Sequence, residues 1–297
     1  MKNILISVLM ANRNNQKYIS QSIESLISQT YHNWELIIVD DCSSDNSPSI
    51  AYAYLKDQRI KYYRNKERLY CGGAKKYAAS KASGSIFVVL DSDDILLSSA
   101  LHCLVQSHIE SIDSGLIYSN HSYIDEKGRV IGKNLWTGEV ESGSTHLHEI
   151  KAHHVLSFKE KYYNMCGGFS DEFRVAEDKD LIYKIEEVSK TRHIDGELYC
   201  YRIHNNSISQ KGAKANLSKT YDIKAKYSAF LRRKNNGFHS LSEERMAELL
   251  YEGAARSVLG FNIINFLWFF QKAFKLNRNM FRGVVVILNK IVNKKNA

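Results

Sequence analysis

The sequence predicts an α/β protein in which a mostly parallel sheet carries helices on both faces and is followed by a basic helical C-terminal region. In the first 122 residues, short runs rich in Ile, Leu and Val alternate with segments whose apolar residues recur at helical spacing. Buried parallel strands are near-continuous apolar runs, because helices cover both faces of the sheet. The last 87 residues differ, with 17 Lys and Arg against five Asp and Glu.

The elements of the first half follow from these patterns in chain order. Apolar runs predict five strands, at 3–10, 34–40, 59–65, 85–90 and 115–119. Helical spacing predicts three helices between them, at 15–30, 73–84 and 96–112. In the first of these helices one face collects Ile19, Ile23, Leu26 and Ile27.

The second half is less regular. A hairpin is expected around Lys127-Gly128, and 137–145 is glycine-rich and loop-like. A helix follows Val175, with Leu181, Ile182 and Ile185 on its inner face. From Leu217 onward helices are joined by a polar turn at 235–237. We expect a domain at 1–210, made of the halves 1–122 and 123–210, and a helical region at 211–297.

Composition excludes several classes of protein. The five cysteines are odd in number and form no C-x-x-C pair, which predicts reduced thiols in a reducing compartment rather than a disulfide framework or a zinc site. The N-terminus lacks the pattern of a signal peptide. Neither apolar stretch of 258–292 offers the ~20 residues of a spanning helix. The basic tail suits an anionic membrane surface or, alternatively, a helical subdomain that packs on the body or on a second subunit. No motif for nucleic-acid binding accompanies it.

The loops that leave the predicted strands should share one edge, because ligands of such sheets bind at the carboxyl ends of the strands. Neither G-x-G-x-x-G nor G-x-x-x-x-G-K-[ST] occurs, which argues against a dehydrogenase and against a P-loop NTPase. The loop after 85–90 instead crowds Asp91, Asp93 and Asp94. Such carboxylates are ligands for Mg²⁺ or Mn²⁺ carrying a diphosphate; the alternative is an acidic turn that caps the next helix. Asp40 and Asp41 form a second acidic loop whose carboxylates can accept hydrogen bonds from a ligand; the alternative is an Asx motif or a helix N-cap.

The segments "QTYHNWELIIVDDCSSDNS" and "GSIFVVLDSDD" resemble family 2 of the GT-A glycosyltransferases, inverting enzymes that use nucleotide-activated sugars. The resemblance begins at Ser7 and covers about two thirds of the chain. Three positions depart from the family pattern: Ala11 replaces a proline, Arg13 an aromatic residue, and Lys75 the arginine of an "ARN" segment. Lysine keeps the charge toward a phosphate but loses the planar fork of arginine.

The resemblance implies a role for each matching residue. Asp41 or Asp40 recognises uracil and ribose, Asp91 lies near the ribose or sugar, and Asp93 binds the metal. In the acidic segment "VAEDKDLIYKI", Asp178 is the expected base and Glu177 lies beside it. The alternative is that these acidic residues only stabilise the N-terminus of a helix, where they are common. The expected donor-binding set is Ala11, Asn14, Asp40, Asp41, Lys75, Asp91, Ser92, Gly167, Gly168 and Arg202. The expected metal ligands are Asp93, Asp91 and His204.

The resemblance therefore implies an inverting glycosyltransferase dependent on Mn²⁺ or Mg²⁺. Its donor would be a UDP-sugar and its acceptor a glycan or lipid-linked sugar of a bacterial surface polysaccharide. We expect it in the cytoplasm, peripheral to the inner face of the cell membrane. A nucleotidyltransferase and a non-catalytic nucleotide- or glycan-binding protein of the same fold remain alternatives. The pairs His146/His148 and His153/His154 lack the surroundings of a metal site and are expected to be loop residues.

Overall fold

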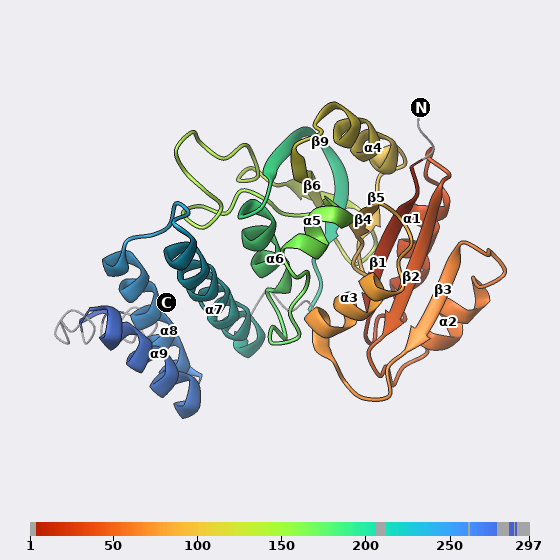
Figure 1. The fold of residues 1–297 in the computed structure, drawn as a ribbon. Coiled ribbons are helices and arrows are strands. Elements are labelled where there is room, and N and C mark those ends of the chain that lie inside the picture. The colour runs from red at the N-terminus through yellow and green to blue at the C-terminus, as the bar shows by residue number, and fades with distance from the viewer. Residues whose placement is uncertain (1–3, 206–211, 261, 278–284, 288, 290–297) are drawn as a thin grey trace. The chain divides into compact units, whose positions relative to one another are not determined.

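The chain folds into two compact units, Met1–Asn205 and Asn206–Ala297. The computed structural model describes residues 4–205, 212–260, 262–277, 285–287 and 289 (Figure 1). The expected domain boundary at 210/211, the end of the segment 201–209 and most of the basic tail after 277 lie outside the described residues.

The first unit holds, among its described residues, a nine-stranded sheet in the order β3-β2-β1-β4-β8-β6-β9-β5, with β7 paired to β6 (Figure 1). The strands are β1 Ile6–Asn12, β2 Trp34–Asp40, β3 Ile60–Arg64, β4 Ile86–Val89, β5 Ile95–Leu96, β6 Ser114–Ile124, β7 Val130–Lys133, β8 Leu156–Lys159 and β9 Lys190–Arg202. The helices are α1 Ile19–Ile27, α2 Ser47–Ala53, α3 Tyr70–Ser80, α4 Ala100–Glu110, α5 Glu160–Met165 and α6 Glu177–Glu186.

The parallel part of the sheet is formed by the strands that the sequence predicted. β1 pairs in parallel with β2 and with β4, and β2 pairs in parallel with β3. The register places Asn12 beside Asp40, and Asp40 beside Arg64. The loops after these strands therefore meet at one edge, as expected from the strand ends.

The other half of the sheet is mixed. β8 is antiparallel to both β4 and β6, while the long strand β9 is parallel to β6 and antiparallel to β5. β6 continues to Ile124, beyond the predicted range 115–119, and turns at Gly128 into β7. The short strands β5 and β8 and the polar strand β9 were not predicted, because their sequences lack a long apolar run.

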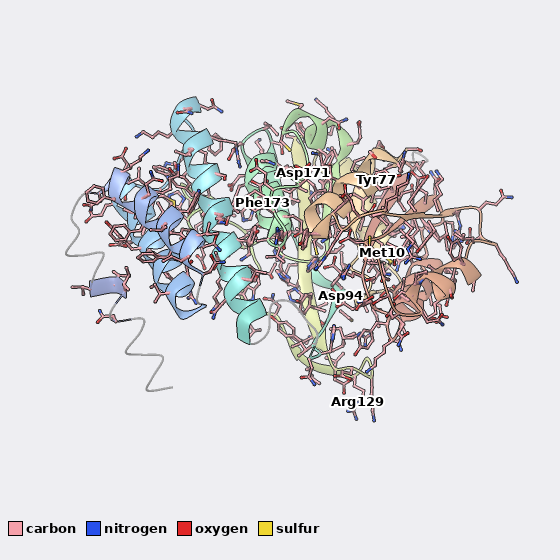
Figure 2. All side chains as sticks on the ribbon, turned by 90° about the horizontal axis from the view of Figure 1, so that it is seen from below. Met10, Tyr77, Asp94, Arg129, Asp171 and Phe173 are labelled. Carbon is pink, nitrogen blue, oxygen red and sulfur yellow. The ribbon has the colours of Figure 1, made fainter. Side chains whose placement is uncertain are left out.

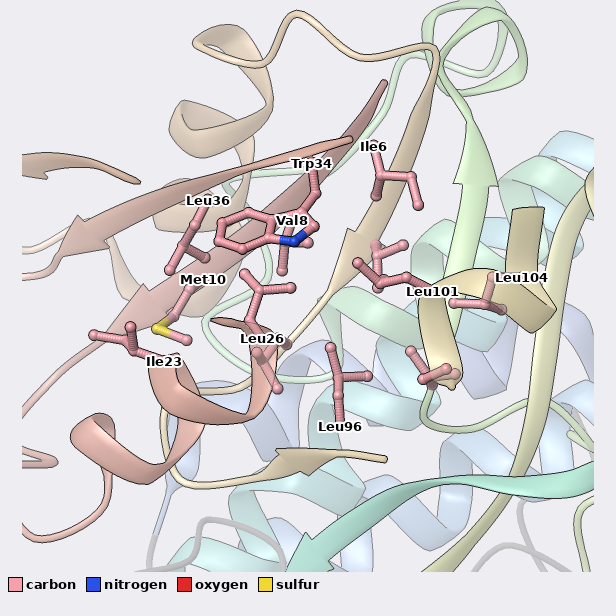
Figure 3. Close-up of a cluster of buried hydrophobic side chains, with 14 of the residues drawn as sticks. Ile6, Val8, Met10, Ile23, Leu26, Trp34, Leu36, Leu96, Leu101 and Leu104 are labelled. Carbon is pink, nitrogen blue, oxygen red and sulfur yellow. The ribbon is translucent and has the colours of Figure 1, made fainter. Parts of the chain in front are cut away.

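Helices cover both faces of the sheet, and the alternation of side chains along the strands explains how. Val8, Leu36 and Val88 point to one face and pack with α1, α2 and α4. Figure 3 shows Val8 and Leu36 with Leu26 of α1 and with Leu101 and Leu104 of α4. Their neighbours Leu9 and Ile37 point to the other face and pack with α3, α5 and α6. Burial on both sides accounts for the near-continuous apolar runs of β1, β2 and β4.

The second unit is built from α7 Gly212–Asn236, α8 Glu243–Leu259 and α9 Ile263–Leu276. Its core joins Phe230 of α7, Leu250 of α8 and Phe269 of α9. The predicted polar turn ends α7, and Gly237 adopts a positive φ of 67° there. Among the described residues, none of the helices combines the length and apolar character needed to cross a bilayer.

Candidate active site

The acidic segment lies directly after β4, in the turn Asp91–Asp94. Asp94, labelled in Figure 2, is buried. Its carboxylate accepts hydrogen bonds from the Tyr199 hydroxyl (2.8 Å) and the Arg202 backbone N–H (2.7 Å), both on β9. Burial, together with the nearby carboxylates of Asp93 and Asp91, raises the pKa of Asp94 well above its usual range. Asp94 thus ties the acidic turn to β9, and the more exposed Asp91 and Asp93 remain for a ligand.

Lys75 joins this turn to the predicted base region. Its ammonium lies 3.0 Å from Asp91 Oδ1 and 2.8 Å from Glu177 Oε1, and the residue is only 3% exposed. Burial by itself lowers the pKa of Lys75, but the two carboxylates outweigh that effect and hold it well above its usual value. Lys75 therefore directs its charge at two carboxylates of this chain, whereas the sequence predicted that it faces a phosphate.

The close approach of α3 to the loop before α6 makes this bridge possible. A Cβ on Gly72 would lie 2.4 Å from the Ser170 carbonyl oxygen and 2.5 Å from the Phe173 carbonyl oxygen. Figure 2 labels Phe173 on this loop and Tyr77 on α3. Only a glycine lets the two backbones come so near, which is the condition for Lys75 to reach Glu177.

Glu177 and Asp178 begin α6 but have different surroundings. Glu177 is buried against Lys75; burial raises the pKa of Glu177, and Lys75 only partly offsets this. Asp178 is half-buried, and its Oδ1 accepts a hydrogen bond from the Lys179 N–H (2.8 Å). It makes no ion pair with any residue that the structure describes. Of the two carboxylates, Glu177 is engaged by Lys75 and Asp178 is the more exposed.

Asp93 and His204, two of the three expected metal ligands, lie in contact with each other. His204 Nε2 lies 2.9 Å from Asp93 Oδ2, and the centroid of the imidazole ring lies 4.8 Å from that of the Tyr18 ring. A carboxylate oxygen and an imidazole nitrogen are ligands that Mn²⁺ accepts. Asp91 is not part of this pair: its ligand atoms group with those of Asp94 and His154, all within 4.8 Å. The donor set of Asp93 and His204 fits a divalent cation in chemistry, whereas Asp94 of the second group is already engaged by Tyr199 and Arg202.

Arg202 lies beside the site but does not direct its guanidinium into it. Its Nε donates to the Asp93 carbonyl oxygen (2.6 Å), Nη1 to that of Asp125 (3.0 Å), and Nη2 to Gln21 Oε1 (2.8 Å). The residue is 1% exposed. These bonds fix the acidic turn to the β6–β7 hairpin, so the arrangement favours a positioning role over the predicted contact with phosphates.

Asp40 and Asp41 at the end of β2 are both buried and hydrogen-bonded within the chain. Asp40 accepts from Asn12 Nδ2 (2.8 Å) and the Ser43 N–H (2.8 Å). Asp41 accepts from the backbone N–H groups of Leu69 (2.7 Å) and Tyr70 (2.9 Å). Asp40 therefore holds the loop after β2 through its bond to Ser43, and Asp41 anchors the start of α3.

The remaining predicted donor residues border the same edge. Asn14 has a positive φ of 55°, and its Oδ1 accepts from the Ser44 N–H (2.8 Å). Ala11 lies near the end of β1, where it pairs with Val39. Ser92 is buried and accepts from Asn15 Nδ2 (2.7 Å).

The predicted pair Gly167-Gly168 follows α5. A Cβ on Gly168 would lie 2.3 Å from Cζ of Tyr163, whereas one on Gly167 would meet nothing within 4 Å. The close approach at Gly168 is thus to an aromatic ring of this chain, and only Gly167 is open.

His154 and Tyr199 lie at the site, although the sequence did not predict either residue there. His154 lies on a loop, as expected, but its Nε2 is 3.4 Å from Asp91 Oδ2, and its ring stacks on Tyr199 at 5.0 Å. Tyr199 also donates to Asp94. No local pattern marks either residue. The antiparallel pairing of β9 with β5, the short strand directly after the acidic turn, places Tyr199 beside that turn.

Comparison with known proteins agrees with this architecture. The family described as Glycosyl transferase family 2 matches residues 7–166, more than half of the chain. The chain belongs to glycosyl transferase family 2, and its fold is the GT-A fold with an additional helical C-terminal region.

Named relatives of the chain come from several bacteria. It is 32% identical over 226 residues to the O-antigen biosynthesis glycosyltransferase WbnJ of Escherichia coli, covering 71% of this chain and 84% of WbnJ. It is 35% identical over 133 residues to the E. coli UDP-Glc:alpha-D-GlcNAc-diphosphoundecaprenol beta-1,3-glucosyltransferase WfgD, covering 45% of this chain and 51% of WfgD. An uncharacterized glycosyltransferase of Rickettsia felis is 28% identical over 82% of the chain, but the match spans only 40% of that protein.

Among solved structures, S. aureus TarS 1–349 in complex with UDP superposes with a TM-score of 0.61 at 17% identity, covering 93% of this chain and 91% of that one. The complex of the same fragment with UDP-GlcNAc gives a TM-score of 0.60 at 18% identity, with 93% and 74% covered. At this identity the likeness concerns the fold.

Proposed function

We propose that this protein is an inverting glycosyltransferase that moves a sugar from a UDP-sugar to a glycan or a lipid-linked sugar in the synthesis of a bacterial surface polysaccharide. Residues 1–210 form its catalytic domain, with the nucleotide-sugar in the half 1–122 and the acceptor in the half 123–210. Two similarities support the donor and the pathway: WfgD is named as a UDP-glucose enzyme, and WbnJ as an O-antigen enzyme.

One observation carries the proposal. Through Lys75, the carboxylate of Asp91 and the first turn of α6 share a single ammonium, at 3.0 Å and 2.8 Å. This bridge brings the acidic turn after β4, with Asp91 and Asp93, next to the helix start that carries Asp178, although the two segments lie far apart in the sequence. A nucleotide-diphosphate position and a base are what a one-step sugar transfer needs.

In the proposed reaction an acceptor hydroxyl attacks the anomeric carbon of the donor while the bond from that carbon to the diphosphate oxygen breaks. Asp178 takes the proton of the hydroxyl as the new glycosidic bond forms. Attack from the face opposite the leaving group inverts the configuration, and the broken bond leaves UDP. Glu177 stays paired with Lys75 and holds the start of α6 in place.

Asp93 and His204 would hold the divalent cation, with Asp91 beside them. Bound Mn²⁺ or Mg²⁺ supplies positive charge that stabilises the diphosphate leaving group. The donor set of one carboxylate oxygen and one imidazole nitrogen suits Mn²⁺ better than Mg²⁺, which prefers oxygen ligands.

Two substitutions test separate parts of this proposal. Asp178→Asn should lower kcat by about 10²–10⁴-fold, the usual contribution of a general base, and leave UDP binding unchanged. Asp93→Asn should abolish the gain in UDP affinity that Mn²⁺ gives over EDTA. Binding is measured by calorimetry, and turnover with UDP-glucose or UDP-GlcNAc and a synthetic GlcNAc-diphospho-lipid acceptor.

Asp171→Asn is the matched control, because Asp171 lies on the loop before α6 with its side chain 66% exposed and pairs with the surface residue Lys76. It should behave as the unchanged protein in both assays. Normal turnover of Asp178→Asn would remove the base assignment. Equal UDP affinity in Mn²⁺ and EDTA would remove the metal assignment.

We also propose that the second unit attaches to the inner face of the cell membrane. α9 exposes Ile263 (64%), Ile264 (78%) and Leu267 (59%), and the sequence after Glu252 contains no acidic residue. An apolar helix face with basic residues around it suits anionic lipid, where each basic residue contributes about 1 kcal/mol. Replacing the three residues with serine should abolish sedimentation with phosphatidylglycerol vesicles; undiminished sedimentation would contradict the proposal. Vesicles of phosphatidylcholine are the control.

A further inference from the structure

An exposed tryptophan stands beside the candidate site, in the half expected to receive the acceptor. Trp136 follows β7 and is 41% exposed, while its neighbour Leu135 is 91% exposed. Asn134 fixes the backbone at this point: its Oδ1 accepts from the N–H groups of Trp136 (2.8 Å) and Thr137 (3.1 Å), and its Nδ2 lies 3.0 Å from His121 Nε2. The backbone that carries the indole is therefore fixed by hydrogen bonds, while the indole itself remains partly exposed.

A row of rings leads from this indole to the acidic turn. Trp136 lies 5.2 Å from His153 between ring centroids, and His153 lies 4.7 Å from His154. His154 Nε2 then contacts Asp91 Oδ2 at 3.4 Å. Two imidazole rings thus separate Trp136 from Asp91, a separation of the order of one or two sugar rings.

The two histidines in this row have unused hydrogen-bonding capacity. Nδ1 of His153 and Nδ1 of His154 are buried, and neither has a hydrogen-bond partner in the part of the chain that the structure describes. His154 as a whole is 5% exposed. Buried polar groups normally have partners, so two unpaired ring nitrogens in one row indicate hydrogen-bonding capacity that a ligand can use.

A pyranose has both an apolar face and polar hydroxyls, which match the indole and the ring nitrogens of this surface. One face of the sugar ring presents C–H groups, which pack on an aromatic plane, and its edge carries hydroxyls, which donate to or accept from ring nitrogens. A binding surface with an aromatic wall and a few fixed polar atoms is the usual form of a small-molecule subsite. A purely structural role would bury the indole in the loop, and its 41% exposure argues against that.

We propose that Trp136 and His153 form the acceptor subsite, in which the indole packs on the terminal pyranose of the acceptor and His153 binds one of its hydroxyls. This inference rests on the proposed glycosyltransferase function and names the residues that select its acceptor. Trp136 sets the affinity for the acceptor and has no part in binding the UDP-sugar.

The first test observes the indole directly. The chain has three tryptophans, and Trp34 is 1% exposed. In ¹⁵N-labelled full-length protein, the indole N–H signal that disappears in Trp136→Phe is that of Trp136. With UDP and Mn²⁺ present, methyl β-glucoside, methyl β-galactoside and the methyl glycosides of GlcNAc are added to tens of millimolar. We expect at least one to shift the Trp136 signal and leave the Trp34 signal in place. A Trp136 signal that none of them moves overturns the subsite.

The second test uses turnover. Trp136→Ala should raise KM for the acceptor at least tenfold with kcat and the affinity for UDP·Mn²⁺ unchanged, and Trp136→Tyr should restore most of the loss. Leu135→Ala is the matched control, and it should leave KM unchanged. An unchanged acceptor KM in Trp136→Ala overturns the inference. Failure of the proposed function is distinguishable from this, because the unchanged protein would then neither bind UDP in a Mn²⁺-dependent way nor transfer sugar.

Discussion

The bridge made by Lys75 leads to a prediction that separates a positioning role from a contact with phosphate. Lys75→Met removes the ammonium and keeps a side chain of similar length. The side chains of Lys75 and Glu177 are 4% and 6% exposed, so Glu177 loses its partner in a place that water does not reach. Breaking a buried ion pair in this way costs about 3–5 kcal/mol.

The expected loss of stability can be compared with that of an exposed ion pair on the same helix. The next residue, Lys76, pairs with Asp171 at 3.2 Å, but these side chains are 49% and 66% exposed, so Lys76→Met should cost about 0–1 kcal/mol. For a unit of this size about 2–4 °C corresponds to each kcal/mol, and Lys75→Met should lower the melting temperature of the first unit by roughly 6–20 °C.

The measurement is urea unfolding of both variants and of Lys75→Met combined with Glu177→Gln. The double change should recover part of the loss, because it also removes the buried negative charge. If Lys75→Met unfolds at the same urea concentration as Lys76→Met, the reasoning is refuted. A loss of UDP affinity at unchanged stability would instead support the phosphate contact that the sequence analysis expected.

Three further results follow from buried contacts. Burial lowers the pKa of His108 to about 3, and Lys159 adds to the effect, so the folded protein holds this imidazole neutral. The free energy of unfolding is therefore highest above about pH 6.5 and should fall by about 2 kcal/mol from pH 7 to pH 5. In urea titrations, His108→Gln should abolish this loss. Asp41→Asn puts an NH₂ group where an oxygen accepts from backbone N–H groups, and should cost about 1–3 kcal/mol; an unchanged melting curve would contradict this. Gly72→Ala should destabilise by about 1–3 kcal/mol, whereas Gly138→Ala, whose Cβ meets nothing within 4 Å, should be neutral; equal melting temperatures would disprove the close approach.

The strands of the parallel half were predictable because burial on both faces gives each of them a continuous apolar run in its own sequence. The predicted range of β2 is the observed one, Trp34–Asp40, and the apolar run before Asp91 is β4. Covering helices on both faces leave every position of such a strand apolar, and a local pattern is enough to detect that. The sequence also indicated the edge at which the acidic residues gather, since the carboxyl ends of parallel strands coincide.

The strands of the other half were not predictable in the same way. β9 carries Arg192, His193 and Glu197 among its 13 residues and has the pattern of a polar segment. It forms a strand because β6 pairs along nearly its whole length. Pairing of that kind depends on a partner about 75 residues away, which no short window contains.

By itself the sequence determined the alternation of strands and helices, the place of the acidic turn and the family to which the chain belongs. Only the tertiary structure decided which charged groups are already paired with one another: Lys75 with Asp91 and Glu177, and Arg202 with backbone oxygens. It also decided that His154 lies against Asp91. The physical reason is range. The burial of a strand can be recognised from consecutive residues of the sequence. The partner of a charged group depends on which distant segments the folded backbone brings within about 3 Å of it.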